Sequence, residues 1–152
     1  MDNELVNEFN TESKNFNSIV SLSDLEIYKI QSSIKDEFGI DINRNWCWES
    51  IGADHKTLEY GKEDGLNKIK ELLDEDTTVK LIITDEEVPP WFGYKGKLAD
   101  LVEVLKKIRY FEFFIIDEKC SWIIFDTHHN TLVFTPIGNQ PVSRLPKSMG
   151  SA

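Results

Sequence analysis

Cysteine is scarce in this sequence. The two that are present, Cys47 and Cys120, lie far apart in the chain of 152 residues. Neither belongs to a C-x-x-C or another metal-spaced motif, so the pattern does not indicate a cysteine zinc site. A chain of this length can bury roughly 70% of the surface that its unfolded form exposes, and it needs no covalent staple. We therefore expect two buried free thiols in a reducing compartment.

Long apolar runs are missing as well. None approaches the roughly 20 residues that a membrane span requires. The first ten residues, MDNELVNEFN, are acidic and lack the basic-then-apolar order of a signal peptide. These absences predict a soluble cytoplasmic protein that binds no membrane. Nucleophile elbows, phosphate-binding glycine loops and dinucleotide fingerprints are also lacking, so we expect no cofactor.

Acidic residues are abundant and unevenly distributed. The formal net charge is −10, with 21 acidic and 9 basic residues in 1–87 but 6 acidic and 8 basic residues in 88–152. Such a field repels nucleic acid and anionic lipid and attracts a basic protein. The alternative is an acidic surface that only keeps the protein soluble. Direct nucleic-acid binding is not expected.

Apolar spacing predicts several helices. The strongest follows Leu22, where Ser23 and Glu26 match a capping box and Gly39 can supply a left-handed stop. Its buried stripe is spaced by three and four residues: Ile27, Ile30, Ile34 and Phe38. Further helices are expected near Leu5–Phe9 and over about 63–74 and 98–108.

Short β-branched and aromatic runs predict strands at 78–84, 110–117, 121–126 and 131–135, with another at Trp46–Trp48. A helix joins 78–84 to 110–117, which favours a parallel or next-but-one placement with a right-handed crossover. The predicted fold class is α+β, with a sheet of four or five strands and helices mainly on one face. Residues 1–135 form the expected single domain, and 136–152 a weakly ordered tail.

The run YFEFFIID, residues 110–117, is apolar on both sides of the expected strand. Alternation places Phe111, Phe113 and Ile115 on one face, and Tyr110, Phe114 and Ile116 on the other. This pattern indicates a central strand that is covered on both faces, by helices or by a partner.

Two adjacent histidines occur in FDTHHNTLVFTP, residues 125–136. Asp126 and His128 can face the same way as D-x-H, but His128 and His129 leave the strand in different directions, and the third zinc ligand would have to be His55. The element His129-Asn-Thr131 also matches H-x-[ST] of two-histidine phosphoesterases, which need two copies. The favoured interpretation is a hairpin corner, with no metal site; a hydrolase or phosphoesterase that uses His128 and His129 is the alternative.

The segment TDEEVPPWFGYKGK, residues 84–97, is the predicted partner-binding site. It links a strand to a helix, where α/β connections often place binding residues. Acidic and aromatic residues beside two prolines are typical of an interface hot spot, and the residues that we assign to it are Asp85, Glu86, Glu87, Trp91 and Tyr94. Alternatively, Trp91 and Phe92 cap the sheet; both interpretations hold if Trp91 is half-buried and Tyr94 is exposed.

The run YFEFFIIDEKCSWIIFDTHHNTLVF, residues 110–134, resembles the C-terminal part of small bacterial immunity proteins of polymorphic and contact-dependent toxin systems. The resemblance extends over about 79–135. It implies a cytoplasmic protein that binds and neutralises one cognate toxin domain, often a basic nuclease. No site residue is carried over from that family.

The leading hypothesis is therefore a non-enzymatic, acidic immunity protein whose partner is a basic toxin C-terminal domain. A nuclease must present Lys and Arg to nucleic acid, so an acidic inhibitor can mimic the phosphate backbone, and complementary charge accelerates capture. Besides the hydrolase, a regulatory interaction module remains an alternative. The sequence leaves the oligomeric state open.

Overall fold

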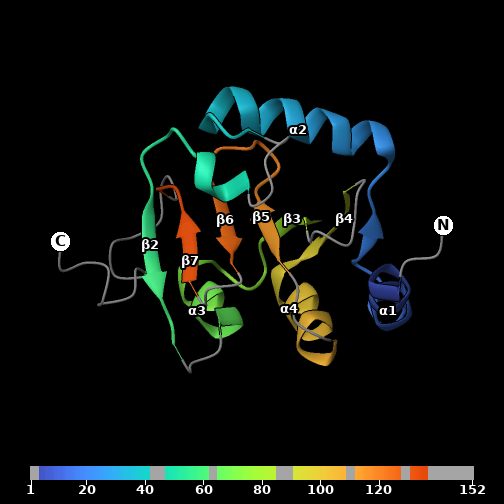
Figure 1. The fold of residues 1–152 in the computed structure, drawn as a ribbon. Helices are drawn as coiled ribbons and strands as arrows, with labels where there is room; N and C mark the ends of the chain where they lie inside the picture. The colour runs from blue at the N-terminus through green and yellow to red at the C-terminus, as the bar shows by residue number, and fades with distance from the viewer. Residues whose placement is uncertain are drawn as a thin grey trace.

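The structure is a computed structural model and describes residues 4–41, 47–61, 65–84, 91–108, 112–127 and 131–136. The expected tail therefore lies outside the described residues from 137 onward. In chain order (Figure 1) the elements are α1 (Glu4–Ser13), β1 (Val20–Ser21), α2 (Asp24–Phe38), the 3-10 helix η1 (Cys47–Ser50), β2 (Lys56–Glu59), α3 (Gly65–Leu72), β3 (Thr78–Ile83), β4 (Phe92–Lys97), α4 (Leu98–Lys107), β5 (Phe113–Ile116), β6 (Ile123–Asp126) and β7 (Thr131–Phe134). Among the described helices, none combines the length and apolar character needed to cross a membrane.

The strands form one sheet in the order β1-β4-β3-β5-β6-β7-β2, and each neighbouring pair is antiparallel. The α+β class is confirmed, but seven strands replace the four or five expected. The additional strands are β1, β2 and β4. The strand predicted at Trp46–Trp48 is wrong for Cys47 and Trp48, because both belong to η1. Trp46 lies outside the described residues. In η1 the indole of Trp48 donates to Glu112 Oε2 at 3.1 Å, a contact with the β5 end of the sheet.

The predicted relation between 78–84 and 110–117 is also wrong, because β3 and β5 are adjacent and antiparallel. The reason is β4, which pairs with β3 along its whole length and reverses the chain before α4 begins. Helix α4 therefore joins β4 to β5. These two strands run parallel and have β3 between them, so the next-but-one placement applies to β4 and β5.

Helices cover both faces of the sheet. Helix α2 lies on one face, while α1, α3 and α4 lie on the other, and Figure 1 shows α2 on the opposite side of the sheet from α3 and α4. The alternation predicted for 110–117 is confirmed where it is described: Phe114 and Ile116 join the core under α2, and Phe113 and Ile115 join the core under the three other helices. Tyr110 and Phe111 lie outside the described residues. Three of the four described helices thus share one face.

Helix α2 has the ends that its sequence predicts. The Glu26 N–H donates to Ser23 Oγ at 3.2 Å, and the Ser23 N–H donates to Glu26 Oε1 at 3.2 Å, which completes the capping box. Gly39 ends the helix with φ of 66°. A Cβ at Gly39 would lie 3.2 Å from the Cα of Gly52, so glycine also permits this close backbone approach.

Candidate functional site

The predicted partner-binding residues fall into two groups. Asp85, Glu86 and Glu87 lie outside the described residues. Trp91 and Tyr94 are described, and they lie on opposite faces of the sheet. Trp91 is half-buried, packs against the core under α2 and meets the Phe114 ring edge-on at 5.8 Å. The structure therefore does not bring Trp91 and Tyr94 together on one surface.

The expected exposure of Tyr94 is wrong, because only 3% of this residue is accessible. Strand β4 lies between β1 and β3, and alternation directs Tyr94 toward α1. Its ring stacks on Phe9 with centroids 4.1 Å apart, and its hydroxyl donates to Asn10 Oδ1 at 2.7 Å. Burial raises the pKa of Tyr94 to about 12. Tyr94 therefore positions Asn10, and only a small part of the residue reaches the surface.

The histidine corner is described only at its edges, since His128 and His129 lie outside the described residues. Asp126 is buried and accepts a hydrogen bond from the Tyr60 hydroxyl at 2.6 Å. His55 lies just before β2, with Nδ1 2.9 Å from Ala53 O. Strand pairing aligns Asp126 with Leu132 and Leu132 with Leu58. His55 is thus separated from Asp126 by two strand spacings across the sheet, on the order of 10 Å, and by three residues along the strand, also on the order of 10 Å. The two side chains are too far apart to share a metal ion.

The described part of the chain has neither a metal-binding cluster nor, at Cys120, a reactive thiol. Among the described residues, no three His, Cys, Asp or Glu side chains gather closely enough to hold a metal ion. The Cys120 thiol is free and buried, as expected, whereas the side chain of Cys47 is not described. Burial, with a smaller effect of the Asp117 and Glu37 charges, raises the pKa of Cys120 to about 11. The protonated thiol is a poor nucleophile at neutral pH.

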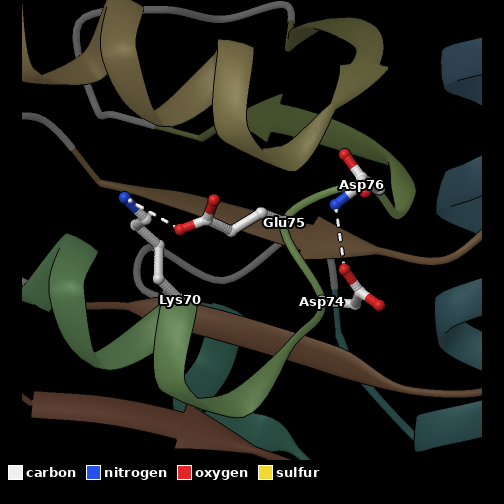
Figure 2. A network of polar contacts seen from close by, with 4 residues as sticks. All are labelled: Lys70, Asp74, Glu75 and Asp76. Carbon is white, nitrogen blue, oxygen red and sulfur yellow. Dashed lines mark hydrogen bonds and ion pairs between the residues drawn. The ribbon is translucent and has the colours of Figure 1, made fainter.

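An acidic turn joins α3 to β3 and exposes three consecutive carboxylates, Asp74, Glu75 and Asp76 (Figure 2). The Asp76 N–H donates to Asp74 Oδ1 at 3.1 Å, and Lys70 pairs with Glu75 at 3.2 Å. Main-chain bonds tie the same turn to the start of α4: the Ala99 N–H donates to the Glu75 carbonyl at 3.0 Å. The amino end of a helix favours nearby negative charge. The backbone of this acidic turn is therefore held in place.

A second acidic surface follows α1. Glu4, Glu8 and Glu12 recur at intervals of four, so they share one side of the helix. They border a hollow of about 550 Å³ that also includes Lys107 and Ile108 at the end of α4. We call this feature the acidic hollow.

A groove lies on the other side of α1. It has a volume of about 790 Å³ and is bounded by α1 and β1, and Tyr94 is part of its lining. The other lining residues are amides, hydroxyls and apolar side chains with one lysine and no carboxylate: Asn7, Asn10, Thr11, Ser13, Lys14, Phe16, Asn17, Ile19, Val20 and Ser21. Asn7 and Thr11 border the groove and the acidic hollow alike. The two depressions therefore adjoin at these two residues of α1.

The sequence contains signals for both acidic surfaces that the partner-binding prediction did not use. The run Asp-Glu-Asp at 74–76 follows a helix and precedes a strand, and the glutamates of α1 are spaced by four residues. The groove has no such local signal, because its walls come from α1 and from a strand of two residues.

The fold and these surfaces define an acidic α+β protein built on one antiparallel sheet. The chain belongs to the family of unknown function DUF6756, which matches residues 3–148. Neither a curated protein nor a solved structure matches the chain.

Proposed function

We propose that this protein is a non-enzymatic, cytoplasmic binding protein that captures and neutralises a basic protein partner, as an immunity protein does with its toxin domain. The observation that carries the proposal is the acidic turn of Asp74, Glu75 and Asp76, whose backbone is held by hydrogen bonds within the turn and to α4. The net charge of −10 adds a long-range attraction for a cationic partner.

Carboxylates on a backbone that is held in place suit this function for two physical reasons. A charged group on a held backbone loses less conformational entropy on binding than one on a mobile loop. In addition, complementary fields raise the association rate more than they raise the final affinity, which favours fast capture. A nuclease domain presents Lys and Arg where phosphates bind, and a cluster of exposed carboxylates can occupy the same positions. The proposed partner is therefore a basic toxin domain, with a nuclease as the first candidate.

The test begins with capture of the partner. Full-length protein is immobilised and exposed to an extract of the source cells at low salt, and bound proteins are eluted with a salt gradient. The expected partner is basic, binds one to one, and associates more slowly as salt increases. Its enzymatic activity should be lost in the complex. A partner that is acidic, or whose association is independent of salt, contradicts the proposal, and a partner that stays fully active indicates a regulatory module instead.

Matched variants locate the contact. Asp74→Asn with Asp76→Asn removes two charges from the acidic turn and keeps the acceptor oxygen of residue 74. Asp36→Asn with Glu37→Gln removes the same charge from the exposed end of α2. The first pair should slow association about tenfold or more at low salt, and the second much less. Equal slowing by both pairs would show that only net charge matters and would exclude the acidic turn as the contact.

A further inference from the structure

The groove between α1 and β1 lies at an edge of the sheet. Strand β1 is the first strand in the sheet order and pairs only with β4 among the described strands. The Leu22 N–H donates to the Gly93 carbonyl at 2.8 Å, and Val20 lies opposite Lys95. Main-chain groups of successive residues in an antiparallel ladder point to alternate sides. The N–H and C=O of Ser21 therefore point away from β4, toward the groove side of the strand.

The side chains of the groove supply hydrogen-bond donors and acceptors together. The Tyr94 hydroxyl donates to Asn10 Oδ1, and the nitrogen of the same amide remains able to donate. The Thr11 hydroxyl donates to the Asn7 carbonyl at 2.8 Å, and the Ser13 hydroxyl donates to the Asn10 carbonyl at 2.9 Å. Both hydroxyl oxygens remain acceptors. A peptide main chain, which carries one donor and one acceptor per residue, matches this mixture.

Apolar groups complete the groove. Phe16 and Ile19 contribute to its lining, and both pack against the core on the α1 side of the sheet. An extended peptide presents alternate side chains to such a surface, which is how strand addition combines main-chain pairing with side-chain selection.

Charge decides which peptide fits. The groove itself has one lysine, Lys14, and no carboxylate, but at Asn7 and Thr11 it adjoins the acidic hollow, where Glu4, Glu8 and Glu12 outnumber Lys107. An occupant that places small or β-branched residues in the groove can therefore place Lys or Arg over the acidic hollow. An acidic peptide would meet the same three carboxylates with like charge.

We propose that this groove binds an extended, basic segment of the protein partner, which adds as a further strand to the outer edge of β1. The inference rests on the proposed function for its partner, and it assigns a second contact surface in addition to the acidic turn.

The test uses full-length protein and three short fluorescent peptides. The first alternates valine with threonine and carries a lysine at each end. The second has the same sequence with alternate main-chain nitrogens methylated, and the third has glutamate in place of lysine. Fluorescence anisotropy should show binding of the first peptide and about tenfold or more weaker binding of the other two. Equal binding of the methylated peptide would exclude strand addition, and no binding of the first peptide would overturn the proposal.

Matched protein variants place the site. Ser21→Lys and Ser32→Lys add the same charge at two exposed serines, but only Ser21 lines the groove, on the same face of the sheet as Tyr94. Ser21→Lys should weaken binding of the lysine peptide about tenfold or more, and Ser32→Lys should leave it within about threefold. Equal effects would contradict the assignment of the groove. If the captured partner still shows salt-dependent binding that neither variant alters, the proposed function stands and this docking site fails.

Discussion

The two faces of the sheet are covered in different ways. One face is covered by α2, a helix of 15 residues with a capping box at its start and a left-handed glycine at its end. The opposite face is covered by α1, α3 and α4, which have 10, 8 and 10 residues. The groove and the acidic hollow both border α1. In the described part of the chain, both depressions lie beside the short helix α1, on the face opposite the long capped helix α2.

This difference separates stability from binding. The buried stripe of α2 contacts the central strands and presents only its outer side to solvent. Helix α1 buries Phe9, and its polar side chains are asparagines, hydroxyls and glutamates. We therefore expect changes under α2 to alter mainly the free energy of unfolding, and changes under α1 to alter the groove as well.

The largest expected effects come from one core residue on each face. Ile34→Ala under α2 should lower the free energy of unfolding by about 2–5 kcal/mol, and Phe9→Ala under α1 by about 3–5 kcal/mol, because both side chains are fully buried. Urea unfolding measures both. Phe9 stacks on Tyr94, which holds Asn10, so only Phe9→Ala should also weaken peptide binding in the groove. Similar loss of binding in folded Ile34→Ala would show that the two faces are not independent.

A smaller effect is expected from the cap of α2. Ser23→Ala removes the acceptor for the Glu26 N–H and should lower the free energy of unfolding by about 1 kcal/mol. Ser32→Ala, at an exposed position in the same helix, is the control and should change it by less than about 0.5 kcal/mol. Equal effects in chemical denaturation would mean that the cap does not stabilise this face.

On the other face, Tyr94→Phe removes one partly buried hydrogen bond to Asn10. The expected loss is about 0.5–1.5 kcal/mol, whereas Tyr28→Phe at an exposed position should have little effect. The pKa of Tyr94 is raised from 10.0 to about 12 by burial, so its neutral form stabilises the fold below pH 10.0 and this contribution is lost as pH rises toward 12. As the pH is raised above 10.0, the free energy of unfolding should therefore fall less steeply for Tyr94→Phe than for the unchanged protein.

The smallest effect concerns the charge of Glu26. Hydrogen bonds from the Ser23 N–H and hydroxyl lower the pKa of Glu26 below 4.5. Its charged form therefore stabilises the fold above pH 4.5, and this contribution disappears as pH falls through the lowered pKa. Glu26→Gln keeps an acceptor oxygen but removes the charge. Its stability deficit should shrink in acid when urea unfolding is compared across pH; a deficit that stays constant contradicts the assignment.

Helix α2 could be predicted closely from the sequence because all its signals are local. Ser23, Glu26 and Gly39 mark its ends within a few residues, and its apolar spacing identifies the buried side. The fifth strand was predictable in its two-sided burial for the same reason, since alternation is visible in the run itself.

Strands β1, β2 and β4 were not predictable because their pairing depends on distant residues. Strand β4, FGYKGK, has two glycines and two lysines and lacks the usual β-branched pattern. Its neighbours require these glycines: a Cβ at Gly93 would lie 2.6 Å from Ile82 Cδ1 and 2.7 Å from the Leu81 carbonyl. Strand β2 buries only Leu58. The incorrect exposure predicted for Tyr94 followed directly from interpreting β4 as a loop.

The order of the strands also constrains how the chain can fold as it is synthesised. Strands β1 and β2 occupy opposite edges of the sheet, and each comes from the first 59 residues. Their pairing partners are synthesised much later: Val20 pairs with Lys95, and Lys56 pairs with Phe134. Strand β1 can pair once β4 has been synthesised, whereas β2 can pair only after β7. Until the middle strands exist, the apolar stripe of α2 has no sheet to pack against and stays exposed on the nascent chain.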